Sequence, residues 1–114
     1  MPTDIGTIEW FASPDDLCRA LAGLQQLAAQ PRLAPLGSIL SANGGGTGLD
    51  PAQWPTVWYK GGSEPGVLTV GFLATSKDQT FVVVAMLSDP AAALSPSATP
   101  ELLAIVRGPF ELAR

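Results

Sequence analysis

Residues 55–87 contain three strand-like runs that are separated by two short turns. The first run, 56–59, is β-branched and aromatic, and the second and third cover 67–74 and 80–87. Strands joined by short turns pair as antiparallel hairpins, so this stretch predicts a three-stranded antiparallel sheet. The run 81–87 is apolar at every position, so we expect it to be covered on both faces or to be a central strand.

Helical patterns lie on both sides of this stretch. Ser13-Pro14-Asp15-Asp16 is typical of a helix start, with a capping serine, a proline in the first turn and acidic residues near the positive end of the dipole. We interpret the two aspartates as capping residues rather than as catalytic carboxylates. The helix should end near residue 30, and a shorter helix is expected over 33–40. A last helix should begin at Thr99-Pro100-Glu101 and bend or end early at Gly108-Pro109.

These elements predict an α+β fold, an antiparallel three-stranded sheet flanked by helices, in one domain that spans residues 1–114. Hydrophobic residues make up 46% of the chain and charged residues 14%, which argues against disorder. So little charge also indicates that some apolar surface lacks a cover within this chain. The net charge is −4 and the six cations are scattered, so no nucleic-acid partner is expected.

Two residue counts exclude several kinds of site. The chain has one cysteine, Cys18, which we interpret as a buried, inert thiol, and it has no histidine. We therefore expect no internal disulfide, no metal site, no cofactor and no histidine-dependent catalytic triad. The first residues carry no signal-peptide pattern, and the run 81–87 is too short to span a membrane.

Two glycine-rich segments precede and follow the first strand. Residues 43–48 read Asn-Gly-Gly-Gly-Thr-Gly, and this glycine content predicts a mobile loop. A phosphate-binding loop is not expected, because it requires a preceding strand and a final Gly-Lys-Ser/Thr, and neither is found here. The second segment is Lys60-Gly61-Gly62-Ser63, at the expected turn over 61–66 between the first two strands. Taken alone, it is typical of a hairpin turn with a solvated lysine.

In context, the second segment resembles a motif of the class A-type β-lactamases and penicillin-binding-protein-like serine hydrolases. The match is concentrated in residues 54–73, which read Trp-Pro-Thr-Val-Trp-Tyr-Lys-Gly-Gly-Ser-Glu-Pro-Gly-Val-Leu-Thr-Val-Gly-Phe-Leu. In that family a Lys-Thr/Ser-Gly triplet ends a sheet-edge strand beside the nucleophile, and a hairpin and a C-terminal helix follow it. The resemblance covers about residues 8–112 and implies a partial β-lactamase/transpeptidase-like α/β domain, its C-terminal portion.

The resemblance implies roles for four residues. Lys60 would place positive charge beside the nucleophile, and Gly62 would let a substrate backbone approach the strand. The backbone N–H of Ser63 would face the oxyanion hole, in which fixed donors stabilise a tetrahedral intermediate. Gly61 departs from the family pattern, because it lacks the hydroxyl that helps to hold the substrate carboxylate. Lys60 and Ser63 are thus the expected catalytic positions, and Gly61, Gly62 and Ser63 the substrate-binding ones.

Other family motifs are not found in this sequence. No serine is followed by lysine three residues later, so the chain lacks the Ser-x-x-Lys nucleophile. Ser41-Ala42-Asn43 has the form of the second motif but lies only 17 residues before Lys60, so we interpret it as a coincidence. Ser88-Asp89-Pro90 reads as a strand-end turn, and Glu9 has no motif around it. This chain alone is therefore expected to be inactive.

Three hypotheses remain open at this stage. The chain is a truncated, split or alternatively started portion of a hydrolase whose completed domain would bind a β-lactam or a peptide-like small molecule of the cell wall. Alternatively, it is a non-catalytic binding or interaction domain on the same scaffold, or an unrelated small α+β domain such as a profilin-like one. The strand at 81–87 would have an open edge, which favours self-association or complementation by another chain. Members of this family usually act outside the cytoplasmic membrane, whereas this chain shows no export signal, so its location stays open.

Overall fold

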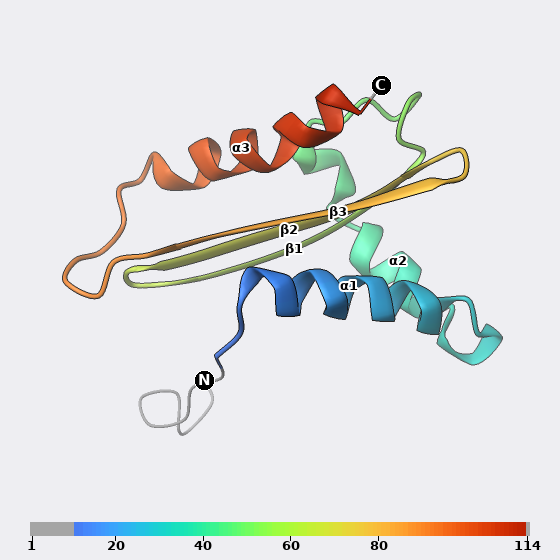
Figure 1. The fold of residues 1–114 in the computed structure, drawn as a ribbon, viewed down its shortest axis with the longest axis horizontal. Helices are drawn as coiled ribbons and strands as arrows, with labels where there is room; N and C mark the ends of the chain where they lie inside the picture. The colour runs from blue at the N-terminus through green and yellow to red at the C-terminus, as the bar shows by residue number, and fades with distance from the viewer. Residues whose placement is uncertain (1–10, 114) are drawn as a thin grey trace.

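Three antiparallel strands in the order β1-β2-β3 form the sheet in the computed structural model, which describes residues 11–113. The strands are β1 (Thr56–Glu64), β2 (Val67–Ser76) and β3 (Gln79–Ser88), each joined to the next by a two-residue turn. Helices cover both faces of the sheet (Figure 1). The predicted α+β class with an antiparallel three-stranded sheet flanked by helices is confirmed.

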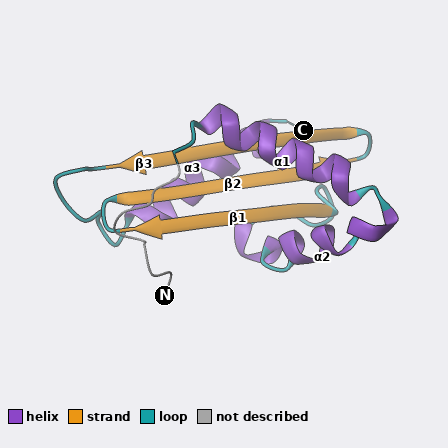
Figure 2. Cartoon of the chain, turned by 90° about the horizontal axis from the view of Figure 1, so that it is seen from below, coloured by secondary structure: helices purple, strands orange, loops and turns teal. Residues whose placement is uncertain are grey.

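The helices divide between the two faces. α1 (Pro14–Ala28) and α2 (Pro35–Ser41) lie on one face, and α3 (Ala98–Leu112) lies on the other (Figure 1). Figure 2 shows α1 crossing over β2 and β3, with α2 beside the start of β1. Two short 3-10 turns, Pro31–Leu33 and Gly44–Thr47, add to the predicted order of helix, short helix, three strands and helix.

The central strand β2 is buried on both faces. Toward α3 it presents Val70 and Phe72, and the Phe72 ring lies 6.0 Å from that of Phe110 on α3. Trp54 meets the Phe110 ring edge-on at 5.4 Å and closes this layer. Toward α1 the strand presents Leu73, which packs with Leu21 of α1 and with Trp58 of β1. The alternation of β2 side chains therefore builds one core layer on each side of the sheet.

The first hairpin turns later than the sequence predicts. The turn was expected over residues 61–66, but β1 continues through Glu64, and only Pro65 and Gly66 form the turn. Gly66 has φ +79°, a conformation that glycine adopts at no steric cost, and Pro65 fits the position before it. Lys60 consequently lies within the strand, not at its end.

The last helix also differs from its prediction. Gly108-Pro109 was expected to bend or end it, but α3 runs to Leu112 with Pro109 inside. The Ala113 N–H donates to the Pro109 carbonyl at 3.1 Å, so the helical pattern resumes after the proline. Phe110 is fully buried among aromatic rings. We attribute the continued helix to this burial. The stabilisation that a buried aromatic side chain contributes is as large as the roughly 3 kcal/mol that an interior proline costs.

The glycine segment before β1 is ordered where a mobile loop was predicted. Residues Gly44–Thr47 form a 3-10 turn, and Thr47 is almost completely buried. The Thr47 hydroxyl donates to the Gly44 carbonyl at 2.6 Å, which closes the turn on itself. A Cβ on Gly44 would lie 2.6 Å from the Val57 carbonyl oxygen, so this turn packs directly on β1.

β3 is an edge strand that is half-buried from Phe81 to Met86. It contacts α1 on one face and α3 on the other, as expected for a run that is apolar at every position. Within residues 11–113 no strand pairs with its outer edge, so the predicted open edge is confirmed for the part of the chain that the structure describes. Cys18, expected to be buried, is half-buried on α1.

The start of α1 provides a test of the local fold. Ser13 caps the helix as predicted, and with Asp16 it forms a capping box: the Asp16 N–H donates to the Ser13 hydroxyl at 3.1 Å, and the Ser13 N–H donates to the Asp16 carboxylate at 2.8 Å. Asp15 instead forms an ion pair with Arg19. We expect Ser13→Ala to lower the free energy of unfolding by about 1 kcal/mol, measured by urea denaturation. An unchanged value would show that the cap does not stabilise the domain.

The same cap predicts a pH dependence. The Ser13 backbone N–H, followed by its hydroxyl, lowers the pKa of Asp16 in the folded state. A carboxyl whose pKa is lowered on folding stabilises the protein above its unfolded pKa of about 4 and loses this effect as pH falls through the folded value. The stability difference between the native chain and Asp16→Ala should therefore shrink from pH 6 toward pH 2. A difference that stays constant over this range would contradict the charge-dependent cap.

Candidate functional site

The β1–β2 hairpin determines which backbone groups reach the outer edge of β1, which is open in that no strand within residues 11–113 pairs with it. Its two-residue turn closes on the pair Glu64 and Val67. A turn of this length closes on a hydrogen-bonded pair, and such pairs alternate along antiparallel strands. Gly62 and Lys60 therefore bond to β2, whereas Gly61 and Ser63 direct their N–H and C=O groups outward. The predicted oxyanion-side N–H, that of Ser63, thus lies at the open edge.

The side chains of the same four residues alternate between the faces. Lys60 shares the α1 face with Trp58, which packs in the α1-side core, and Gly62 follows on that face. Gly61 and Ser63 share the α3 face. The four residues predicted from the sequence are therefore contiguous along the edge, but they do not converge on one face.

A cavity of about 280 Å³ lies between α1 and the sheet next to Lys60. Three of the predicted residues, Lys60, Gly61 and Gly62, line it, and Ser63 does not. The remaining lining is largely apolar and comes from α1, β2 and β3: Leu17, Ala20, Leu21, Leu24, Thr69, Gly71 and Val84. α1 approaches the sheet closely at Gly71, where a Cβ would lie 3.1 Å from the Leu21 Cδ1 atom. The sequence gives no signal for this cavity, because its wall depends on where α1 crosses the sheet.

The ammonium group of Lys60 turns toward the open edge. It donates a hydrogen bond to the Gly61 carbonyl, one of the outward-facing backbone groups. Among residues 11–113 the ion pairs are Arg19 with Asp15 and Arg107 with Glu111, and Lys60 takes part in neither. Its charge is therefore available to an anion that approaches the edge of β1.

Tyr59 is a residue of this site that the sequence pattern did not indicate. Its ring lies along β1 over Gly61, so that a Cβ on Gly61 would lie 3.0 Å from the Tyr59 Cζ atom and would overlap the hydroxyl oxygen. A side chain at position 61 would therefore have to displace the Tyr59 hydroxyl. The spacing Tyr-x-Gly within a strand, with an aromatic ring covering a glycine two residues on, is the signal that would have found it.

The other motifs show only local contacts. The Ser41 hydroxyl donates to the Gly37 carbonyl at 2.7 Å, within one turn of α2. The Asp89 carboxylate accepts from the Ala91 N–H at 2.8 Å, as in a turn. These contacts agree with the interpretation of both segments as structural. Glu9 lies outside the described residues.

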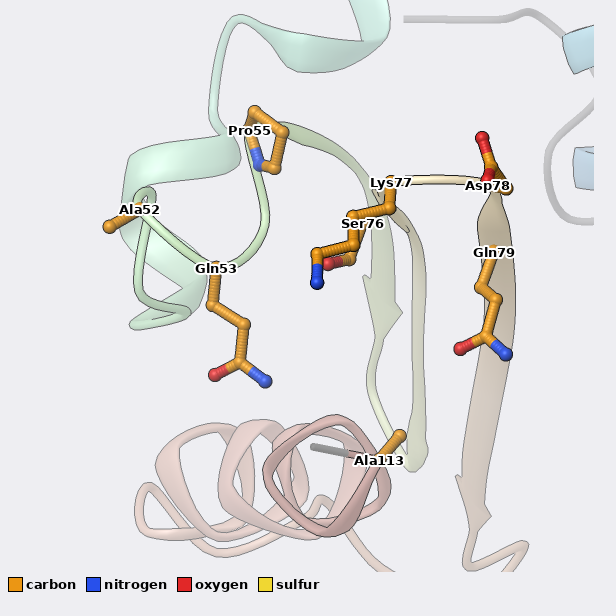
Figure 3. Close-up of a pocket in the computed structure, with 8 residues that line it drawn as sticks. All are labelled: Ala52, Gln53, Pro55, Ser76, Lys77, Asp78, Gln79 and Ala113. Atoms are coloured by element: carbon orange, nitrogen blue, oxygen red, sulfur yellow. The ribbon is translucent and has the colours of Figure 1, made fainter.

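A second cavity, of about 580 Å³, lies at the opposite end of the sheet. Figure 3 shows Gln53 entering it from the segment before β1, while the β2–β3 turn contributes Ser76, Lys77, Asp78 and Gln79. None of the residues of the Lys60 segment line it. Within residues 11–113, no three His, Cys, Asp or Glu side chains gather as a metal site would require. No helix in that part of the chain is both long and apolar enough to cross a membrane.

Neither a scan against models of known protein families nor a search of curated protein sequences found a match to this chain.

Gly66 offers a test of the hairpin that places the site. A Cβ there would overlap the Asp89 carbonyl oxygen, and the φ of +79° disfavours any side chain. We expect Gly66→Ala to lower the free energy of unfolding by about 2 kcal/mol. Gly62→Ala is the matched control, because nothing lies within 4 Å of its Cβ, and it should change stability by less than about 0.5 kcal/mol. Equal effects of the two substitutions in a denaturation series would contradict this hairpin geometry.

Proposed function

We propose that this chain is the C-terminal part of a penicillin-recognising, β-lactamase-like serine hydrolase, and that it supplies one wall of the active site without the nucleophile. In this proposal Lys60 adds positive charge beside a serine carried by another segment. The Ser63 N–H stabilises the oxyanion of the tetrahedral intermediate, and Gly61 and Gly62 let the substrate lie along β1. Alone, the chain binds without catalysing.

The observation that carries the proposal is the open edge of β1. The outward N–H of Ser63, the outward carbonyl of Gly61 and the Lys60 ammonium lie along the same stretch of this edge. An extended, amide-containing ligand can add to such an edge as a further strand, with main-chain hydrogen bonds to the protein. β-Lactams and peptides ending in D-Ala-D-Ala have this amide character and carry a carboxylate, which suits the lysine charge.

The opposite side of the molecule supports the idea of a completing segment. The outer edge of β3 has no partner strand within residues 11–113. Large apolar side chains on α3 are also uncovered in the described chain: Ile105 is 64% exposed and Leu112 88%. Ile105 and Leu112 lie seven residues apart on α3, which places them on one stripe of the helix. Additional strands beside β3 and a helix over α3 would cover these surfaces.

The alternative is a non-catalytic binding domain on the same scaffold. Pairing of a peptide with the β1 edge requires no nucleophile, so the backbone groups at that edge are sufficient for this function. The two functions differ in the gene: a Ser-x-x-Lys encoded in frame upstream supports the hydrolase, and an upstream region without one supports the binding domain.

Ligand binding can be tested on the chain as it exists. Titration of the ¹⁵N-labelled protein with benzylpenicillin should shift the amide signals of Gly61 and Ser63, whose N–H groups face outward. The amides of Thr80 and Val82, on the opposite edge of the sheet and outside the cavity beside Lys60, are the internal control and should not move. Shifts confined to β3, or no shifts at millimolar ligand, would contradict the proposed site.

Catalysis is tested separately with a fluorescent penicillin. Because the sequence has no Ser-x-x-Lys, we expect intact-mass spectrometry to show no covalent adduct after prolonged incubation. A stoichiometric adduct on any serine would overturn the prediction that the chain is inactive alone.

The β3 edge generates a prediction about association. Long apolar edges pair with other chains, and natural sheets prevent this with charged residues. We expect static light scattering to show concentration-dependent association of the native chain, and Met86→Lys, on β3, to reduce it. The exposed Lys77→Glu substitution, at the β2–β3 turn, is the control that changes charge away from the strand. A native chain that stays monomeric and does not bind hydrophobic dyes would count against an edge that needs a partner.

A further inference from the structure

Tyr59 has a fixed position at the edge of β1. It pairs across the sheet with Phe72, and the two rings meet edge-on at 5.8 Å with an interplanar angle of 66°. Phe72 is fully buried and in turn packs against Phe110. The core therefore holds the Tyr59 ring along the strand, with its hydroxyl over Gly61.

The Tyr59 hydroxyl is available to a ligand. Within residues 11–113 the Tyr59 hydroxyl has no hydrogen-bond partner, and that part of the chain contains no buried side-chain oxygen or nitrogen without a partner. The described residues therefore do not seal the hydroxyl in the core. A phenolic O–H that is free to donate can form a hydrogen bond to a carboxylate.

Gly61 lies between two donors. The Tyr59 hydroxyl covers it on the α3 face, and the Lys60 ammonium approaches its carbonyl from the α1 face. The backbone of Gly61 points outward between them. A carboxylate on a ligand that pairs with the β1 edge would meet the positive charge on one side and the neutral hydroxyl donor on the other.

We propose that Tyr59 is a specificity-determining residue that binds the carboxylate of an extended, peptide-like ligand together with Lys60. This proposal rests on the proposed function, since it concerns a ligand at the same edge. A side chain at position 61 would work against this role, because it would displace the Tyr59 hydroxyl. The Tyr59 hydroxyl then takes the place of the Thr or Ser hydroxyl that the resemblance implies at position 61.

The experiment compares two probes on the ¹⁵N-labelled chain: an acetylated Lys-D-Ala-D-Ala peptide and the same peptide with a C-terminal amide. The native chain should bind the acid about tenfold more tightly than the amide, the size of one hydrogen bond to a charged group. Tyr59→Phe keeps the ring and should remove most of this preference without weakening binding of the amide. Gly61→Ala should act in the same direction. Gly45→Ala, whose Cβ meets open space, is the control.

A rescue variant separates a role in binding from one in folding. Tyr59→Leu should lose the preference for the acid, and Tyr59→Leu with Gly61→Thr should recover it, because the threonine hydroxyl then occupies the vacated space. The amide spectrum of each variant reports whether the fold persists.

The outcomes distinguish this proposal from the one on which it rests. If the native chain binds the acid and the amide equally at Gly61 and Ser63, the carboxylate role is overturned and the edge site stands. If Tyr59→Phe retains the full preference for the acid, the role of Tyr59 is overturned and that of Lys60 stands. If neither peptide shifts the β1 amides, both proposals are overturned.

Discussion

The burial of β2 on both faces is the constraint on which the rest of the structure depends. It is the one described strand with a partner on each side, and its residues alternate between the α3 core and the α1 core. Both helical layers are positioned by this strand, because α3 packs on Phe72 and α1 on Leu73 and Gly71. A small sheet of this kind depends on packing against helices for its stability, and here both faces supply such packing.

The two edges of the sheet have different chemistry. The β1 edge carries a lysine and glycines, and its outward backbone groups lie beside a lysine that forms no ion pair within residues 11–113. The β3 edge is apolar from Phe81 to Leu87 and has no charged residue in that run. Charge at an edge discourages pairing with another protein, whereas an apolar edge favours it. A small ligand at β1 and a protein segment at β3 are therefore compatible on one sheet, and neither would block the other.

The sequence predicted the class, the order of elements and the start of α1, because hydrophobic periodicity and the Ser13 cap are local signals. It failed where long-range packing overrides a local preference. Pro109 is a helix breaker in sequence, but Phe110 is held in the core by Trp54. Glycines 44–46 look mobile, but buried Thr47 closes their turn. Of the candidate site, a local motif predicts Lys60 to Ser63, whereas the position of the Tyr59 ring over Gly61 depends on its packing against Phe72 across the sheet.

The two-residue turn at Pro65 and Gly66 has a consequence for how this chain can vary. Adding or deleting a single residue between Trp58 and the turn would exchange the two faces of the strand, placing the lysine against the α3 core and turning the Ser63 N–H inward. Changes of two residues would preserve both. Length variation among related chains should therefore occur in even steps within this hairpin, while single insertions should collect in the segment between β3 and α3.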